Sequence, residues 1–365
     1  MYKFLLIEDS KTDIESFNET IERLNREKKE TIYELIVASC FKSGMELINK
    51  DFDGIIVDIK LDNDKNGNEI IDEIMKKSRV PVVVYTGTPN VRDDIAAKVR
   101  VYTKGKDKQV DIIKYICSIL DTGLFCVLGR TGIIEQKITE VFWENLYPLR
   151  ELWMDYKSMD INTEKVLLRY ALANIQEHFD ITDNGDETCD DPYLAEEMYV
   201  KYINTVNSVN RLQTGTIVKG KNDNEKYFII LSPPCDLALH KGKFKSDRIL
   251  LCEIENNKEV YNDLINSVKH IEKKQKLIKK LINNSYYNYY HWLPESKIFK
   301  GGCINFRKIK TISLDEYKNQ FELPKFKVQE VFVKNILNRF SSYYSRQGQP
   351  DFDFEKESKS ICKDL

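Results

Sequence analysis

The chain has 365 residues, and its 56 Lys and Arg against 58 Asp and Glu give a formal net charge of −2. Such a balance gives the whole protein no strong attraction to nucleic acid or to a membrane surface. No apolar run approaches the roughly 20 residues that span a bilayer, so we expect no membrane partner. The length exceeds what one core usually holds, which predicts two or three domains.

Two features concern the cellular compartment. The first residues, MYKFLLIEDS, run from a short apolar stretch into acids without the small-residue cleavage site of a signal peptide. The eight cysteines are scattered and form no CxxC pair, as is typical of reduced thiols. We therefore expect a cytoplasmic protein.

Residues 1–122 alternate strand and helix patterns five times, and we assign them to one domain. Short apolar runs, typical of strands that are buried on both faces, occur at 3–7, 33–38, 54–58, 81–87 and 99–105. Helical patterns follow at 11–25, 43–50, 68–77, 90–98 and 110–121. This alternation predicts a doubly wound, flavodoxin-like α/β fold with a five-stranded parallel sheet and right-handed crossovers.

Chemically active side chains follow four of these strands. Glu8 and Asp9 follow the first strand, Asp58 ends the third, Thr86 lies at the end of the fourth and Lys104 near the end of the fifth. Ligands of doubly wound sheets bind at the carboxyl ends of the strands. We therefore expect these five side chains to converge on one edge of the sheet.

Three carboxylates in one place repel one another unless a cation is bound, and oxygen ligands with open positions favour Mg²⁺. A carboxylate beside such a metal, with a lysine opposite, can act as a nucleophile and form an aspartyl phosphate. Lys104 would then neutralise the phosphoryl oxygens, and Thr86 would hydrogen-bond to one of them.

The motifs LIEDS, GIIVDIKL, VVVYTGT and VYTKG stand at these strand ends in this order. In this respect residues 1–120 resemble the receiver domain of bacterial two-component response regulators. The resemblance implies that Asp58 is the phosphoacceptor and that a histidine kinase or kinase-like ATPase is the partner. It also implies a switch pair and a metal site. The switch residues are Thr86 and Tyr102, and Lys104 corresponds to the invariant lysine of the family. The Mg²⁺ ligands are Glu8, Asp9, Asp58 and the backbone carbonyl of Lys60.

The chain departs from the family's pattern at two points. Gly105 follows Lys104 where the family usually has proline, and the predicted fourth helix, which often contributes to receiver pairing, is short. A homodimer therefore stays an open possibility. Two alternatives also stay open, namely a purely structural doubly wound domain and a receiver that no longer accepts phosphate.

The second half loses this regular alternation. Residues 123–212 read as a helical connecting region, with helices at 132–155, 163–179 and 194–212 and an acidic loop at 180–192. Residues 213–365 read as an α+β output domain with a small β-barrel-like unit, and its expected strands are 214–220, 226–232, 248–254, 286–293 and 301–312. Helices are expected at 263–282 and 331–346.

The segment ILSPPCDLALH contains Cys235, Asp236 and His240, which could ligate zinc or supply a thiol nucleophile and its base. No second Cys/His pair at finger spacing accompanies them. The structural alternative, which we favour, is a tight Pro-Pro turn after a strand.

Three further features of this half suit a nucleic-acid partner, although a structural role is favoured for each. The basic run SVKHIEKKQKLIKK could contact phosphates, or could be the solvated face of a helix. The run SYYNYYHWLP could stack bases, or could send alternate rings into a core. Arg339 and Arg346 lie seven residues apart and could read an anion, or could pair with Asp351 and Asp353.

We therefore expect a signalling protein whose receiver, phosphorylated on Asp58 with Mg²⁺, controls a non-standard output domain. No recognisable catalytic motif shows whether that output domain is an enzyme. The alternatives for it are an enzymatic or toxic effector, as in antiviral defence, and a nucleic-acid-binding module.

Overall fold

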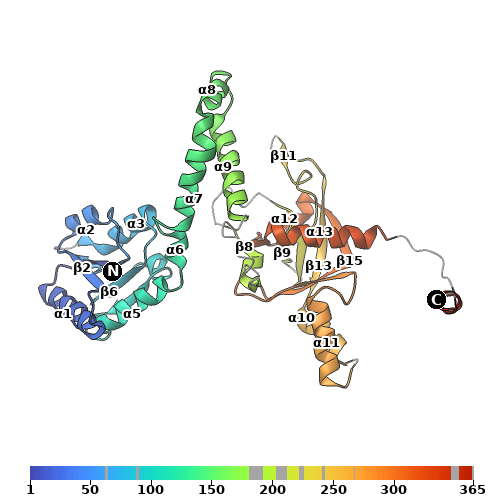
Figure 1. Cartoon of the computed structure of the whole chain (residues 1–365), viewed down its shortest axis with the longest axis horizontal. Coiled ribbons are helices and arrows are strands. Elements are labelled where there is room, and N and C mark those ends of the chain that lie inside the picture. Colours follow the sequence, from blue (N-terminus) through green and yellow to red (C-terminus); the bar gives the residue numbers. More distant parts are fainter. Residues whose placement is uncertain are drawn as a thin grey trace. The chain divides into compact units, whose positions relative to one another are not determined.

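The computed structural model describes residues 1–61, 65–87, 90–180, 192–202, 212–221, 226–240, 243–266, 268–346 and 353–363. The chain divides into two compact units, Met1–Cys189 and Asp190–Leu365 (Figure 1). This division differs from the three regions predicted, because the helices between 124 and 180 group with the parallel sheet.

A five-stranded parallel sheet forms the N-terminal part of the first unit, in the order β2-β1-β3-β6-β7 (Figure 1). Its strands are β1 (Tyr2–Ile7), β2 (Tyr33–Ala38), β3 (Gly54–Val57), β6 (Val82–Thr86) and β7 (Arg100–Thr103). The helices between and after them are α1 (Lys11–Lys28), α2 (Phe41–Leu47), α3 (Gly67–Lys77), α4 (Asp93–Ala96) and α5 (Gln109–Leu120). The predicted doubly wound, flavodoxin-like fold is confirmed for residues 1–122.

Both faces of this sheet are buried, because successive residues of a strand point to opposite faces. Leu5 and Ile7 of β1 join a core with residues of α3 and α4. Phe4 and Leu6 join a second core with residues of α1 and α5. The continuous apolar runs of the sequence therefore mark strands that are covered by helices on both sides.

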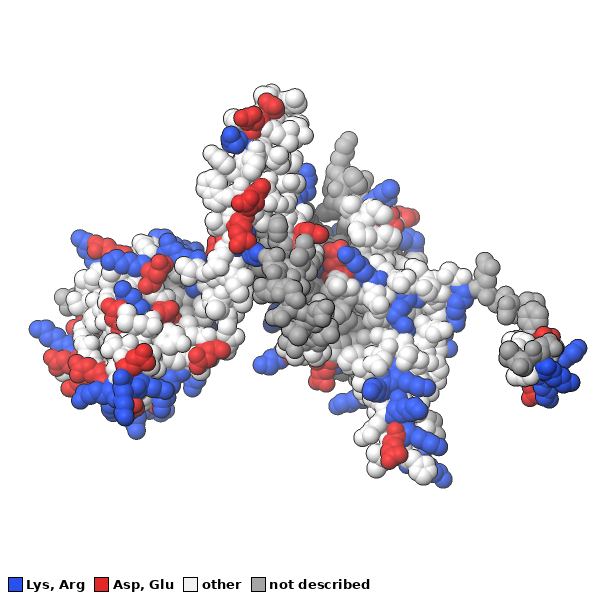
Figure 2. All heavy atoms as spheres, in the orientation of Figure 1, with Lys and Arg blue, Asp and Glu red and all other residues white. Residues whose placement is uncertain are grey.

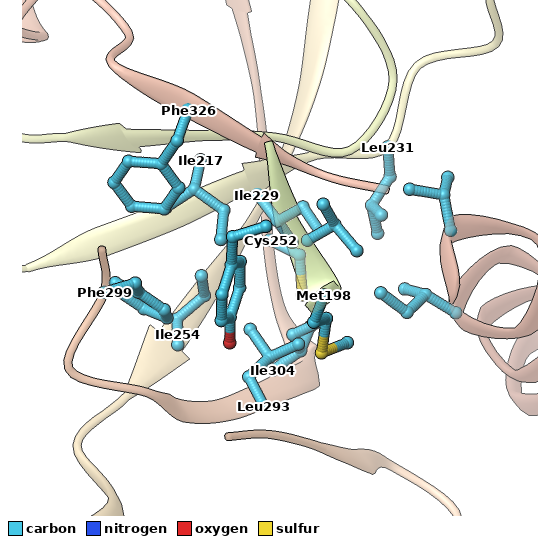
Figure 3. Close-up of a cluster of buried hydrophobic side chains, with 14 of the residues drawn as sticks. Met198, Ile217, Ile229, Leu231, Cys252, Ile254, Leu293, Phe299, Ile304 and Phe326 are labelled. Carbon is cyan, nitrogen blue, oxygen red and sulfur yellow. The ribbon is translucent and has the colours of Figure 1, made fainter. Parts of the chain in front are cut away.

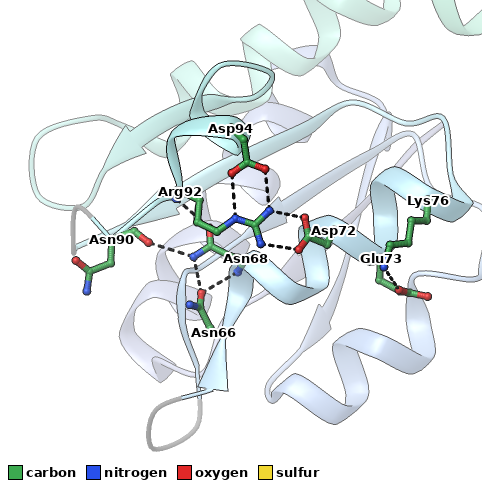
Figure 4. Close-up of polar contacts among 8 residues, drawn as sticks. All are labelled: Asn66, Asn68, Asp72, Glu73, Lys76, Asn90, Arg92 and Asp94. Carbon is green, nitrogen blue, oxygen red and sulfur yellow. Dashed lines mark hydrogen bonds and ion pairs between the residues drawn. The ribbon is translucent and has the colours of Figure 1, made fainter. Parts of the chain in front are cut away.

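A polar network joins α3 to the segment that leads into α4 (Figure 4). The guanidinium of Arg92 donates to Asp72 at 2.7 and 2.8 Å and to Asp94 at 2.9 and 3.0 Å. The buried side chain of Asn68 donates to the carbonyl of Asn90 at 3.1 Å. These contacts hold the short α4 in position beside the start of α3.

Residues 124–180 of the first unit are mainly helical, as predicted for this stretch, and the acidic loop expected at 180–192 lies almost wholly outside the described part. Its elements are α6 (Leu124–Leu128), α7 (Ile133–Val141), the π-helical turn η1 (Phe142–Leu146), the 3₁₀ turn η2 (Tyr147–Leu149), α8 (Arg150–Ser158) and α9 (Thr163–Asp180). Among the described residues no single helix is long and apolar enough to cross a membrane, although the segments Gln109–Leu120 and Leu124–Ser158, bent by 61°, pass that test as a pair.

A curled, seven-stranded antiparallel sheet organises the second unit, in the order β14-β15-β13-β10-β9-β16-β8. Its strands are β8 (Tyr199–Lys201), β9 (Thr216–Lys219), β10 (Tyr227–Ile230), β13 (Arg248–Glu255), β14 (Tyr290–Leu293), β15 (Gly302–Ser313) and β16 (Phe326–Val328). The short strands β11 (Leu239–His240) and β12 (Lys243–Phe244) pair separately. The predicted mixed α+β character with a barrel-like unit is confirmed.

Five helical elements of this unit pack against the sheet or its ends. They are the 3₁₀ turn η3 (Ala195–Met198), α10 (Asn257–Asn266), α11 (Ile271–Ile282), α12 (Leu314–Gln320) and α13 (Glu330–Tyr344). The last helix, α14 (Phe354–Ile361), buries none of its residues. The main core, which includes Ile229, Cys252 and Ile304, lies between the sheet and α13 (Figure 3). A second core, with Phe228, Leu251 and Tyr317, lies on the opposite face.

Three predicted elements of this half are corrected by the structure. The helix expected over 194–212 is wrong at 195–201, where η3 leads into β8 and buries Met198 and Tyr199 in the main core; residues 203–211 lie outside the described part. The strand expected over 286–293 is only β14, and the helix expected over 263–282 is two helices, α10 and α11.

Candidate functional site

The carboxyl edge of the parallel sheet brings together the side chains that the strand ends predicted. One oxygen each of Glu8, Asp9 and Asp58 lies within 4.8 Å of the others, and this is the only such group of potential metal ligands among the described residues. Glu8 and Asp58 are buried, whereas Asp9 is exposed. The cluster thus has two fixed carboxylates and one that is open to solvent.

Backbone hydrogen bonds fix the two buried carboxylates. The amide of Asp58 donates to the carbonyl of Ile7 at 2.9 Å, which extends the pairing of β3 with β1 by one residue. The amide of Ser10 donates to Glu8 Oε1 at 3.0 Å, and the side chain of Ser10 also caps α1. The turn after β1 therefore sets the direction of the Glu8 side chain.

Lys104 is the cation of the site. Its Nζ lies 2.6 Å from Glu8 Oε2, 2.8 Å from Asp58 Oδ2 and 3.0 Å from Asp13 Oδ2. Burial alone would lower the pKa of Lys104, but the bonds to Asp58, Glu8 and Asp13 raise it above its usual value. An ammonium has three N–H donors, and here three carboxylates lie within ion-pair distance of it.

The charge of this cluster is not balanced by Lys104. Burial raises the pKa of Glu8 to about 7; its bond to Lys104 opposes this rise and the charge on Asp58 adds to it. A buried carboxyl group that resists ionisation beside two other acids indicates a site short of positive charge. A divalent cation with oxygen ligands fits this donor set.

A small hairpin, β4 (Lys60–Leu61) with β5 (Lys65–Asn66), stands between Asp58 and α3. The amide of Lys60 donates to Asp58 Oδ1 at 3.3 Å. A Cβ on Gly67 would lie 2.1 Å from the carbonyl oxygen of Asp58, so only glycine allows this close approach. The acidic tip of the hairpin, residues 62–64, lies outside the described part.

The two predicted switch residues lie on neighbouring strands. Thr86 is buried at the end of β6, and its carbonyl accepts a hydrogen bond of 3.0 Å from the amide of Lys104. Tyr102 of β7 is buried, with its ring 6.1 Å from that of Tyr115 and the guanidinium of Arg100 at 5.2 Å. The structure leaves the switching roles of Thr86 and Tyr102 as predictions.

Sequence reasoning missed two residues of this site. Asp13 lies in the first turn of α1, four residues after Asp9, and reaches Lys104. Tyr85 is buried, and its ring centre lies 5.8 Å from Lys104 Nζ. The sequence gives only a weak indication of either residue. An acid near a helix N-terminus and an aromatic residue in a buried strand are both common in proteins that have no functional site there.

The candidate residues of the second unit do not form a comparable cluster. Cys235 is exposed, and its Sγ lies 3.8 Å from Asp236 Oδ1. The amide of Asp236 donates to the carbonyl of Pro233 at 3.0 Å, which fits the turn expected after the strand. The backbone of His240 lies in β11, but its side chain is outside the described part, so a site of these three residues stays a prediction.

The basic helix and the two arginines have structural contacts. The Lys side chains of α11 gather on its solvent face (Figure 2), while Leu281 is buried in a small core. Arg339 donates to the carbonyl of Tyr290 at 2.9 Å. Arg346 lies beyond the end of α13 and donates to the carbonyl of Tyr343, and Asp353 caps α14. The expected Arg–Asp pairing is therefore wrong for Asp353, and Asp351 lies outside the described part.

The strand order and the acidic edge give residues 1–122 the fold of a receiver domain, as the sequence motifs predicted. Solved structures similar to this part include a CheY-like receiver from Methanospirillum hungatei (20% identity, TM-score 0.29, 33% of this chain and 95% of that one). A receiver from Clostridium thermocellum (19%, TM-score 0.27, 35% and 100%) is also similar. So is the response regulator TrrA from Thermotoga maritima, in complex with Mg²⁺ and BeF (22%, TM-score 0.25, 33% and 99%).

These similarities concern the fold of the N-terminal third alone. No protein-family model matches the chain. No curated protein matches it either.

Proposed function

We propose that this chain is a response-regulator-like signalling protein that accepts a phosphoryl group on Asp58 from a partner histidine kinase. The observation that carries the proposal is the cluster of Glu8, Asp9 and Asp58, with Lys104 bonded to two of the three. A structural doubly wound domain has no need to bury two carboxylates at one strand edge, because burial of charge is costly.

The residues present fit a Mg²⁺ ion. Glu8, Asp9 and Asp58 would hold it through side-chain oxygens. The resemblance to receiver domains adds the backbone carbonyl of Lys60 as a fourth ligand. When bound, the ion would offset the charge of these acids and of the incoming phosphoryl oxygens. Asp9, the exposed member of the group, leaves the cluster open to solvent on its side.

The chemical step is a transfer between two nucleophiles. A carboxylate oxygen of Asp58 attacks the phosphorus of a phosphohistidine, an O–P bond forms, and the N–P bond breaks. The imidazole keeps the electron pair of that bond and takes up a proton. No oxidant or reductant takes part in this exchange.

Lys104 is suited to stabilise the product. In the unphosphorylated structure the carboxylate of Asp58 accepts one N–H of Lys104 at 2.8 Å. Phosphorylation converts this carboxylate into an acyl phosphate. That donor becomes available for a phosphoryl oxygen. The hydroxyl of Thr86, a buried residue at the end of β6, would donate a second hydrogen bond to the phosphoryl group. The changed contacts of Thr86 and Lys104 would then bias a two-state element.

Acetyl phosphate labelling tests this proposal. We expect incorporation of one phosphoryl group per chain in the presence of Mg²⁺, read by intact-mass spectrometry. Chelation of the metal and the substitution Asp58→Asn should each abolish it. Asp53→Asn is a matched control, because Asp53 bonds to the amide of Lys3 at the opposite end of the sheet.

Labelling that persists in Asp58→Asn would contradict the assignment of the phosphoacceptor. Absence of labelling with acetyl phosphate and with each purified histidine kinase of the source organism would favour a receiver that no longer accepts phosphate.

A further inference from the structure

The segment between α11 and β14 carries three tyrosines, of which Tyr287 is exposed and Tyr286 and Tyr289 are half-buried. The rings of Tyr287 and Tyr289 stack with centroids 4.8 Å apart and planes inclined by 23°. The guanidinium of the exposed Arg307, from β15, lies 3.8 Å from the centre of the Tyr289 ring. Tyr287 is 38% exposed, and the ring of Tyr286 meets its ring edge-on with centroids 4.2 Å apart, so the stacked pair of Tyr287 and Tyr289 is partly open to solvent at Tyr287.

A second pair of the same kind lies beside this stack. Arg346 is exposed, and its guanidinium is 4.0 Å from the ring centre of Tyr343 on α13. The rings of Tyr343 and Tyr289 are 6.4 Å apart. We call the five residues Tyr287, Tyr289, Arg307, Tyr343 and Arg346 the Tyr–Arg surface.

This surface is held in place by a residue beneath it. Arg339 of α13 donates from Nη2 to the carbonyls of Tyr290 at 2.9 Å and Tyr287 at 3.4 Å. The segment that carries Tyr287 and Tyr289 is therefore tied to the helix that carries Tyr343. A rigid aromatic surface loses little conformational entropy when a ligand binds to it.

The cations of the Tyr–Arg surface are not used in the fold's ion pairs. Among the described residues, no carboxylate forms an ion pair with Arg307 or with Arg346, whereas the neighbouring Lys308 pairs with Glu255 at 2.7 Å. Charges that do not neutralise a partner in the fold remain available to an anionic ligand.

The composition of the whole second unit fits such a ligand. Residues 190–365 contain 30 Lys and Arg against 23 Asp and Glu, a formal net charge of +7. Tyrosine rings and guanidinium planes stack on nucleobases, and cations alongside them neutralise phosphates. An acidic peptide would use the charges but would leave the exposed ring of Tyr287 without a stacking partner.

We propose that the Tyr–Arg surface binds single-stranded nucleic acid, with a base on Tyr287 and backbone phosphates near Arg307 and Arg346. A duplex keeps its bases stacked within the helix, so it cannot use the ring of Tyr287 in this way. This binding involves the second unit alone and does not require phosphoryl acceptance at Asp58.

Fluorescence anisotropy with the full-length chain tests the inference. The probes are labelled single strands of about 12 nucleotides, within the range that aromatic single-strand binders cover. One probe is RNA, one is DNA of the same sequence, and one is the corresponding duplex. We expect binding of at least one single strand that is tighter than binding of the duplex and that weakens with added salt.

Substitutions then separate stacking from charge. Tyr287→Ala should weaken single-strand binding about tenfold, the usual loss for one stacked base, while Tyr287→Phe keeps the ring and the affinity. Arg307→Gln with Arg346→Gln should lower both the affinity and its salt dependence. Arg150→Gln is the matched control, because Arg150 is an exposed arginine beside a tyrosine ring, Tyr147, in the other unit.

Several outcomes would overturn the inference. These are no binding of either single strand at low salt, equal losses in Tyr287→Ala and Arg150→Gln, or equal affinity for single strand and duplex. Displacement of the probe by polyglutamate as effectively as by unlabelled oligonucleotide would show that the surface selects acidic chains. Equal melting temperatures of all variants ensure that a loss of binding is not a loss of fold.

Discussion

The two units of this chain use charge in opposite ways. Residues 1–189 carry 26 Lys and Arg against 35 Asp and Glu, whereas residues 190–365 carry 30 against 23. The acids of the first unit include three that surround one lysine at a sheet edge, while the exposed cations of the second include arginines that lie on tyrosine rings. The near-neutral total therefore conceals one unit suited to a cation and one suited to anions.

This difference shows that the net charge of the whole chain describes neither unit. The balance of −2 indicated no global attraction to nucleic acid, and that statement is true of the chain as a whole. It does not hold for a unit taken by itself, because screening limits electrostatic attraction to a range of about 10 Å at ordinary salt. The charge of each compact unit is the quantity that bears on its partner.

The largest expected effect comes from a large-to-small substitution in the core of one unit at a time, which tests whether the two units are independent. Phe17 and Phe306 are both completely buried, one in each unit. We expect Phe306→Ala to cost about 3–5 kcal/mol in the second unit and to leave phosphoryl labelling of Asp58 unchanged. Phe17→Ala should cost a similar amount in the first unit and abolish labelling.

Calorimetric melting of the two variants, together with mass-spectrometric labelling, checks this prediction. If Phe306→Ala also reduces labelling, the two units are not energetically separate, and the comparison fails. A single melting transition that moves equally in both variants would lead to the same conclusion.

A smaller effect is expected from glycines beside the acidic cluster. In Gly67→Ala the new Cβ would meet the carbonyl of Asp58 at 2.1 Å, and the backbone must shift, at a cost of about 1–3 kcal/mol. The control is Gly87→Ala, whose Cβ would lie 4.0 Å from the Lys104 side chain, an ordinary contact. We expect Gly67→Ala to lower both the melting temperature and the labelling, and Gly87→Ala to change neither. Equal behaviour of the two variants would show that this turn does not position Asp58.

The second unit has a pH dependence that the first does not share. Burial lowers the pKa of His291 to about 3, and the nearby charge of Arg339 contributes. The unfolded chain therefore binds a proton near pH 6.5 that the folded chain does not accept, and stability should fall as the pH drops below 6.5. The expected slope is about 1.4 kcal/mol per pH unit.

His291→Leu should remove this slope, whereas replacement of the exposed His270 by leucine should keep it. The measurement is denaturant unfolding at several pH values between 7 and 4, expressed as the difference between variant and wild type. A difference that does not change with pH would contradict a buried, neutral His291.

Most of the first unit could be predicted from the sequence, because its strands are continuous apolar runs that end in distinctive residues. Each strand end carries its own chemistry, and the parallel topology brings these ends to one edge. Asp13 could not be predicted in this way, since its contact with Lys104 depends on the length and direction of α1 rather than on a strand end.

The fold of the second unit was harder to predict from the sequence, because its sheet is formed by antiparallel strands from distant parts of the chain. β8 and β16 are three residues each and pair with one another across more than a hundred positions, which no local pattern reports. The tyrosines of 286–290 were expected to alternate along a strand. Only Tyr290 belongs to β14. Tyr287 and Tyr289 precede the strand, so their side chains do not have to point to alternate faces of a sheet, and their rings stack.

The smallest expected effect concerns Asp13, and it tests how the acidic unit balances its charge. Asp13 lies outside the cluster of potential metal ligands but takes up one N–H of Lys104, at 3.0 Å. Asp13→Asn removes one negative charge near the incoming phosphoryl group and leaves more of the ammonium's charge for it. The gain should match that of a partly exposed ion pair, about 0.5–1 kcal/mol, or roughly a two- to fivefold faster labelling by acetyl phosphate.

Asp13→Glu keeps the charge and should label at close to the wild-type rate, which separates charge from a change of fold. Glu15→Gln is a matched control, since Glu15 is exposed on the same helix and has no ion pair among the described residues. Slower labelling in Asp13→Asn would mean that Asp13 is needed to position Lys104. The acidic unit would then depend on three carboxylates around its lysine, of which only Glu8 and Asp58 also belong to the group of potential metal ligands.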